Sequence, residues 1–143
     1  MVHAENSLVI NKPIEDVYDF LADGLNNLKW RPAVINITLA AGSAGIVGAE
    51  YKQEMKGPGG RTIAGDYRIT VADLNKELSF VVTAGPARPT GSYHLEAVPG
   101  GTKVTFTLDL APKDLMWLMS PMIKKMMNSE VAQLSELKLM LES

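Results

Sequence analysis

The side chains of this chain that could do chemistry are tyrosines and carboxylates set among apolar residues. Tyr51, Tyr67 and Tyr93 fall on the same face of their predicted strands as the apolar residues, and Gln53 shares that face. A buried phenol needs a partner for its hydroxyl group. Two interpretations stay open. Each hydroxyl reaches the sheet edge, a loop carbonyl or a water molecule, or the hydroxyls converge on a ligand, as the few polar groups of an apolar pocket do.

One glutamate stands out on the predicted C-terminal helix. At 100° per residue, Glu130 falls in the middle of the apolar face, between Met126, Met127 and Leu134, with Gln133 beside it. Burial raises the pKa of a carboxyl group that lacks a partner, and such groups mark functional sites. The alternative, which we favour, is that the helix lies wide of the sheet here and Glu130 only borders solvent.

Five of the eight methionines lie between Leu115 and Met127. At 100° per residue, the predicted apolar face of the terminal helix contains Leu115, Met119, Met122, Ile123, Met126, Leu134, Leu137, Met140 and Leu141. A methionine stripe at helical spacing is typical of a core, because the thioether fills irregular gaps. Adjacent methionines specify a unique core poorly, however, so we favour a cavity of a few hundred Å³ for apolar ligands. A membrane-surface helix is a third alternative, but Lys124 and Lys125 supply little basic charge for it.

Composition excludes several classes of function. The net charge of −2 and the lack of a basic patch argue against nucleic acid as a partner. The chain has no cysteine, and His3 and His94 are far apart, so we expect neither a metal site nor a cofactor. A metal site built on carboxylates alone stays open, although no loop has calcium-binding spacing. There is no signal peptide and no run of about 18 apolar residues, so we expect a cytoplasmic protein without stable membrane insertion. A homodimer stays open.

The order of predicted elements shows what must position these side chains. A strand ending at Ile10 is followed by one helix from Pro13 and a second short helix over 25–30. Six strands then alternate with short turns over 34–110, and a helix runs over 113–141. The sheet should be antiparallel, with seven strands in total, and its apolar face needs the terminal helix as a cover.

Side chains alternate between the two faces of a strand, so the sequence of the six strands predicts which side chains face that helix. An opening should lie where the turn over 57–61, the loop over 84–89 and the start of the terminal helix meet, flanked by Met116, Trp117 and Pro86 to Pro89. The residues expected on the inner face are Ile35, Ile37, Leu39, Val47, Ala49, Tyr51, Gln53, Met55, Ile63, Gly65, Tyr67, Ile69, Val71, Leu78, Phe80, Val82, Tyr93, Leu95, Ala97, Val104, Phe106, Leu108 and Leu110.

This order of elements, with "KPIEDVYDFLAD", "NNLKWRP" and a final helix ending "LSELKLMLE", resembles the START-related superfamily, whose bacterial branch is the polyketide cyclase/dehydrase and lipid transport family. The resemblance covers nearly the whole chain. It implies an α+β helix-grip fold: a seven-stranded curved antiparallel sheet wrapped around a long C-terminal helix, with two short helices between strands 1 and 2, in a single domain over 1–143. Members bind lipids, sterols, polyketides, plant hormones or quinones, and a few catalyse cyclisation or dehydration.

We therefore expect the chain to bind or carry a small hydrophobic ligand of lipid, polyketide or aromatic type between sheet and helix. An enzyme of the cyclase or dehydratase type, with tyrosine and Glu130 as acid and base, is an alternative. A protein-interaction module is another, and it would show a collapsed cavity and an exposed apolar patch. The expected ligand-binding residues are Tyr51, Gln53, Met55, Tyr67, Phe80, Tyr93, Met119, Met122, Ile123, Met126 and Glu130.

Overall fold

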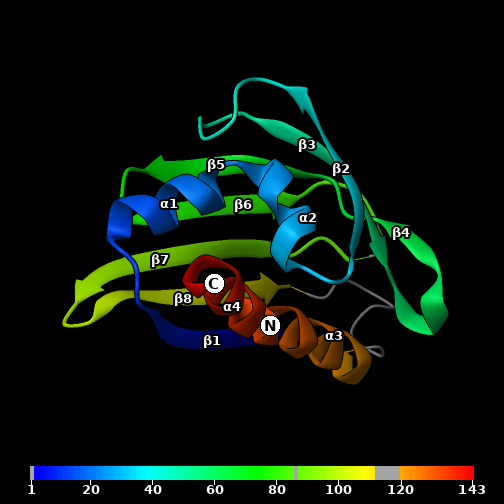
Figure 1. Ribbon diagram of the computed structural model, residues 1–143. Coiled ribbons are helices and arrows are strands. Elements are labelled where there is room, and N and C mark those ends of the chain that lie inside the picture. The colour runs from blue at the N-terminus through cyan, green and yellow to red at the C-terminus, as the bar shows by residue number, and fades with distance from the viewer. Residues whose placement is uncertain (1, 86, 112–119) are drawn as a thin grey trace.

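A computed structural model describes residues 2–85, 87–111 and 120–143. Figure 1 shows a curved sheet with all the α-helices on one side of it. The N-terminal half contains β1 (Val2–Ile10), α1 (Ile14–Ala22), η1 (Gly24–Asn26), α2 (Asn27–Trp30), β2 (Val34–Ala41), β3 (Glu50–Lys56), η2 (Pro58–Gly60), β4 (Thr62–Ala64) and β5 (Tyr67–Asp73). The C-terminal half contains β6 (Glu77–Val82), β7 (Thr90–Val98), β8 (Gly101–Leu110), α3 (Ser120–Ala132) and α4 (Leu134–Glu142).

The strands form one antiparallel sheet, as the sequence predicts. Their order is β1-β8-β7-β6-β5-β3-β2, and β4 pairs with β3 beside β5. β1 pairs along its whole length with β8, from Val2 opposite Leu110 to Ile10 opposite Thr102. The strand expected over 62–71 is divided at Gly65 and Asp66 into β4 and β5, so the sheet has eight strands and not seven.

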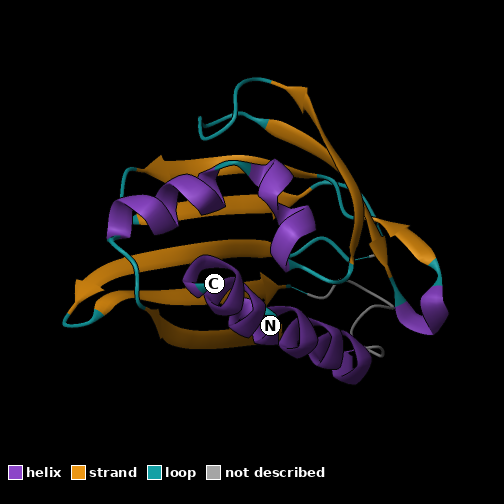
Figure 2. Cartoon of the chain, in the orientation of Figure 1, coloured by secondary structure: helices purple, strands orange, loops and turns teal. Residues whose placement is uncertain are grey.

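The terminal helix covers the inner face of the sheet, as expected (Figure 2). α3 packs against β1 and β8, and α4 packs against β1 and α2. The helix is interrupted at Gln133, whose amide donates to the carbonyl of Glu130 at 3.1 Å, a tighter three-residue spacing. The predicted segment over 113–119 lies outside the described residues.

The buried side of the terminal helix is rotated from the predicted one. Ile123, Met127 and Val131 are buried on α3, whereas Met122 is 52% exposed. Apolarity alone placed Met122 in the stripe, but a methionine tolerates solvent, and only the contact with β1 and β8 decides which side faces inward. Met140 on α4 is also exposed; it lies 18 residues after Met122 and therefore at the same helical angle.

The predicted inner face of β2 was right at Ile37 and wrong at Ile35 and Leu39. Val34 and Ile37 are buried, while Ile35 and Leu39 are exposed. The pairing with β3 shifts register between Val34 and Asn36, which marks a β-bulge. A bulge adds one residue and so moves the next side chains to the other face. Val47 is exposed as well, because it lies in the loop before β3.

Candidate ligand-binding cavity

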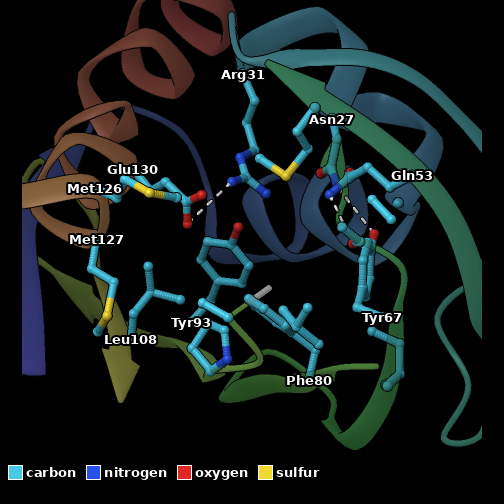
Figure 3. A pocket seen from close by; sticks show the side chains of 18 of the residues that line it. Asn27, Arg31, Gln53, Tyr67, Phe80, Tyr93, Leu108, Met126, Met127 and Glu130 are labelled. Atoms are coloured by element: carbon cyan, nitrogen blue, oxygen red, sulfur yellow. Dashed lines mark hydrogen bonds and ion pairs between the residues drawn. The ribbon is translucent and has the colours of Figure 1, made fainter. Parts of the chain in front are cut away.

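A cavity of about 70 Å³ lies between the sheet and α3, closed at one side by η1 and α2 (Figure 3). Its wall is mainly apolar, with a small number of polar side chains. The polar members are Asn27, Arg31, Gln53, Tyr67, Tyr93 and Glu130. The large apolar members are Leu21, Met55, Ile63, Ile69, Leu78, Phe80, Val82, Leu108, Ile123, Met126 and Met127.

An open groove of about 400 Å³ lies between α3 and the chain segments at the start of β2 and the end of β3. Met126 and Glu130, one helical turn apart, line both the groove and the cavity, so they form the wall between the two. The cavity is smaller than the few hundred Å³ expected, because side chains such as Met127, Phe80 and Tyr93 fill most of the space. The groove is lined by Ala33, Lys56, Gly57, Met122, Lys125, Met126, Ser129, Glu130 and Gln133.

A buried polar network lies at one end of the cavity. Asn27, the first residue of α2, donates through Nδ2 to Oε1 of Gln53 at 3.1 Å and to the hydroxyl of Tyr67 at 3.0 Å. Nε2 of Gln53 donates in turn to the carbonyl of Gly65 at 3.3 Å. All three side chains are buried, and together they join α2 to β3 and β5. Burial raises the pKa of Tyr67 well above its usual value, so this phenol stays neutral.

Tyr51 lies behind this network and does not line the cavity. Its ring stacks on that of Tyr67, with centroids 5.0 Å apart, and its hydroxyl accepts a hydrogen bond from the amide of Gly24 at 3.3 Å. A Cβ atom on Gly24 would come within 2.7 Å of the Tyr51 ring. Glycine is therefore required at the start of η1 for the tyrosine rings to pack under it.

An ion pair between Arg31 and Glu130 lies at the junction of cavity and groove. The side chain of Arg31 is only 6% exposed, and its Nη2 lies 3.8 Å from Oε2 of Glu130, which is 22% exposed. Nε of Arg31 donates to Oε1 of Gln133 at 3.4 Å, and the guanidinium lies 5.8 Å from the ring centroid of Trp30. Burial raises the pKa of Glu130, and the Arg31 charge opposes that rise only in part.

Tyr93 is the central side chain of the cavity floor. Its ring stacks on Phe106 at 4.5 Å, and Trp30 meets it edge-on at 6.2 Å. Its hydroxyl points toward Arg31 and Glu130 (Figure 3). Burial raises the pKa of Tyr93 to about 12, against the lowering effect of Arg31. A neutral donor thus faces the cavity.

The structure brings most of the predicted site residues to this cavity. From the sequence we favoured the interpretation that Glu130 only borders solvent. The structure differs, because Glu130 lines the cavity wall and pairs with Arg31. Met122 lines only the outer groove, and Met119 lies outside the described residues. The predicted residues that line the cavity are Gln53, Met55, Tyr67, Phe80, Tyr93, Ile123, Met126 and Glu130.

Sequence reasoning missed Asn27 and Arg31, both at the short helix α2. This helix has one turn, so no periodicity shows which of its side chains are buried. The only signal was the presence of an asparagine and an arginine beside Trp30 just before Pro32. Of the predicted opening, Ala87 and Pro89 line the cavity and Gly57 lines the groove, whereas Pro86, Met116 and Trp117 lie outside the described residues.

Within the described ranges, no group of three or more histidine, aspartate or glutamate side chains is close enough to hold a metal ion. The two histidines form surface pairs, His3 with Asp109 at 2.6 Å and His94 with Glu77 at 3.8 Å. Likewise, no helix in the described part of the chain is long and apolar enough to cross a membrane.

Comparison with known proteins gives a family and a set of similar folds. The model of the family described as polyketide cyclase / dehydrase and lipid transport matches residues 1–138. A comparison with curated proteins gives no match. The solved structures that follow are at most 18% identical to this chain, so they show the fold alone.

A protein from Thermus thermophilus has a TM-score of 0.78 and 18% identity, over 95% of this chain and 94% of its own. A START superfamily protein from Mycobacterium smegmatis has a TM-score of 0.77 and 13% identity, over 96% of this chain and 95% of its own. The di-domain ARO/CYC StfQ from the steffimycin biosynthetic pathway has a TM-score of 0.78 and 14% identity, over 99% of this chain and 50% of its own. The helix-grip fold expected from the sequence is therefore confirmed.

Proposed function

Because the chain belongs to the polyketide cyclase / dehydrase and lipid transport family, we propose that it binds and carries a small hydrophobic molecule of lipid, polyketide or aromatic type. The molecule lies between the sheet and α3. The observation that carries this proposal is the mainly apolar cavity with a few inward polar groups, among them the Tyr93 hydroxyl, which points toward Arg31 and Glu130. Such a combination orients a ligand without holding it covalently.

The small free volume requires side chains to make room for the ligand. Met126 and Met127 lie on the helical wall, and methionine has three rotatable bonds and adapts its shape to its surroundings. The groove beyond Met126 offers space into which this wall can open. A ligand larger than the free volume thus enters by displacing thioether side chains rather than by breaking the sheet.

Two measurements test the proposal. Native mass spectrometry of freshly purified protein should show a co-purified small molecule. Titration with the neutral apolar dye Nile red should show saturable binding, which the substitution Met126→Trp should weaken at least about tenfold by filling the cavity. The matched control is Met140→Trp, an exposed methionine on α4 that lines neither cavity nor groove.

Absence of both a co-purified molecule and saturable dye binding would contradict the carrier function. Equal loss of dye binding in Met126→Trp and Met140→Trp would show that the dye binds elsewhere. Circular dichroism of each variant checks that the fold is retained.

The cyclase or dehydratase alternative has one specific observation in its favour. Tyr93, Arg31 and Glu130 combine a neutral proton donor, a cation and a carboxyl group with a raised pKa at one end of the cavity. Such a set provides a general acid, a general base and a group that stabilises an enolate. Dehydration of an aromatic β-hydroxyketone, followed by the absorbance of the conjugated product, tests it. Loss of turnover in Glu130→Gln with retained dye binding would favour the enzyme.

A further inference from the structure

We infer that the ligand of this cavity is an amphipathic monoanion, with a carboxylate-type group that binds Arg31 and an apolar body that enters the cavity. The ligand oxyanion takes the place that Glu130 holds beside Arg31. This inference rests on the proposed binding function and names the ligand class. It is argued from the bonding of Arg31, the charges along the entry route and the position of Glu130.

Arg31 has donors to spare. A guanidinium carries five N–H groups, and in the described residues only Nε has a hydrogen-bond partner, Gln133 at 3.4 Å. The Nη2 to Oε2 distance of 3.8 Å to Glu130 is an ion-pair distance but too long for a hydrogen bond. A nearly buried guanidinium with unused donors on a cavity wall fits a planar carboxylate, which accepts two parallel hydrogen bonds.

The charges along the route favour an anion. The groove is lined by Lys56 and Lys125, and the cavity next to it by Arg31. Within the described ranges, Glu130 is the one acidic residue that lines either. Among the described residues the route thus carries three cations and one anion, although the whole chain has a net charge of −2. Cationic clefts raise the local concentration of anions and steer them inward.

The position of Glu130 allows its side chain to rotate away from Arg31. It lies on the wall shared by cavity and groove and is 22% exposed, whereas Arg31 is held between Gln133 and Trp30. Rotation of the Glu130 side chain toward the groove brings its carboxylate to water near Lys125, which also lines the groove. The guanidinium then has no counter-ion until the ligand supplies one, and the Tyr93 hydroxyl below it can donate to the same oxyanion (Figure 3).

Matched acids and amides test this ligand class. We would titrate 2-naphthoate, decanoate and their primary amides into the protein at about pH 7.5 by calorimetry, since each amide keeps the shape and removes the charge. For each skeleton that binds, the acid should bind at least about tenfold more tightly than the corresponding amide. The two skeletons distinguish an aromatic acid from a fatty acid as the source of the carboxylate.

Three variants identify the groups responsible. Arg31→Met should abolish the preference for the acid, and Glu130→Gln should widen that preference by removing the carboxylate that competes for Arg31. Arg68→Met is the matched control, because it removes an exposed cation on β5 that lines neither cavity nor groove. If Arg31→Met does not fold by circular dichroism, the Glu130→Gln result decides.

The possible failures are distinct. Amides that bind as well as acids, or an acid preference lost equally in Arg68→Met, would overturn the anion inference and leave the carrier function in place. A narrower acid preference in Glu130→Gln would also overturn it. If neither acids, amides nor Nile red bind, the proposed function fails with it.

Discussion

Asn27 and Tyr67 are joined by a hydrogen bond of 3.0 Å that connects the one-turn helix α2 to strand β5 across the end of the cavity. The same amide group of Asn27 also donates to Gln53 at 3.1 Å. One buried side chain thus holds together a helix and two strands that are distant in sequence. A buried donor with two acceptors cannot be removed without leaving both acceptors unsatisfied.

Replacing Asn27 with alanine should lower the free energy of unfolding by about 2 kcal/mol or more, since Gln53 and Tyr67 lose a buried partner. Urea denaturation measures this. Asn36→Ala is the control, because Asn36 is exposed on β2 and should change stability by less than about 0.5 kcal/mol. Equal effects of the two substitutions would show that the network contributes nothing specific.

Two methionines of α3 should differ sharply in their contribution to stability. Met127 is 4% exposed and Met122 is 52% exposed. Met127→Ala should cost about 2–5 kcal/mol through lost packing, and Met122→Ala less than about 0.5 kcal/mol. Thermal and urea unfolding of both variants provide the comparison. A larger loss for Met122→Ala would mean that α3 is rotated from the arrangement described.

Tyr67 and Tyr93 should lose their phenolic protons at a higher pH than exposed tyrosines. Burial raises the pKa of Tyr67 and Tyr93, the latter to about 12, while in the unfolded chain both titrate near 10. The unfolded state therefore loses these protons first, so stability is fully present below about pH 10 and falls as pH rises toward 12. Absorbance of tyrosinate against pH, with and without denaturant, measures the shift. Native ionisation near pH 10 without unfolding would contradict the burial.

The surface pair with Asp109 should raise the pKa of His3. The hydrogen bond from the ring to the Asp109 carboxylate is the main cause, and the desolvation of His3 opposes it. The pairing favours the folded state below the ordinary pKa of about 6.5 and is lost as pH rises through the folded value. NMR titration of the ring protons should show a value above that of a free histidine. Asp109→Asn should lower it, and an unchanged value would exclude the pair.

The pattern of the sequence determined the order of elements and most of the inward strand faces. Tyr67, Phe80, Tyr93 and Phe106 are all buried where alternation placed them, because a period of two cannot be shifted without exposing every apolar side chain of a strand. The same reasoning placed Gln53 on the inner face, where it lines the cavity. These are local properties, set by residues two positions apart.

The tertiary structure alone decided three features: the β-bulge after Val34, the break at Gln133 and the meeting of Arg31 with Glu130. Each depends on contacts between segments far apart in the chain, and such contacts leave no periodicity in the sequence. The free volume of the cavity also could not be predicted from the sequence. It is the small difference between the space enclosed by sheet and helix and the side chains that fill it, so only the packed arrangement could decide it.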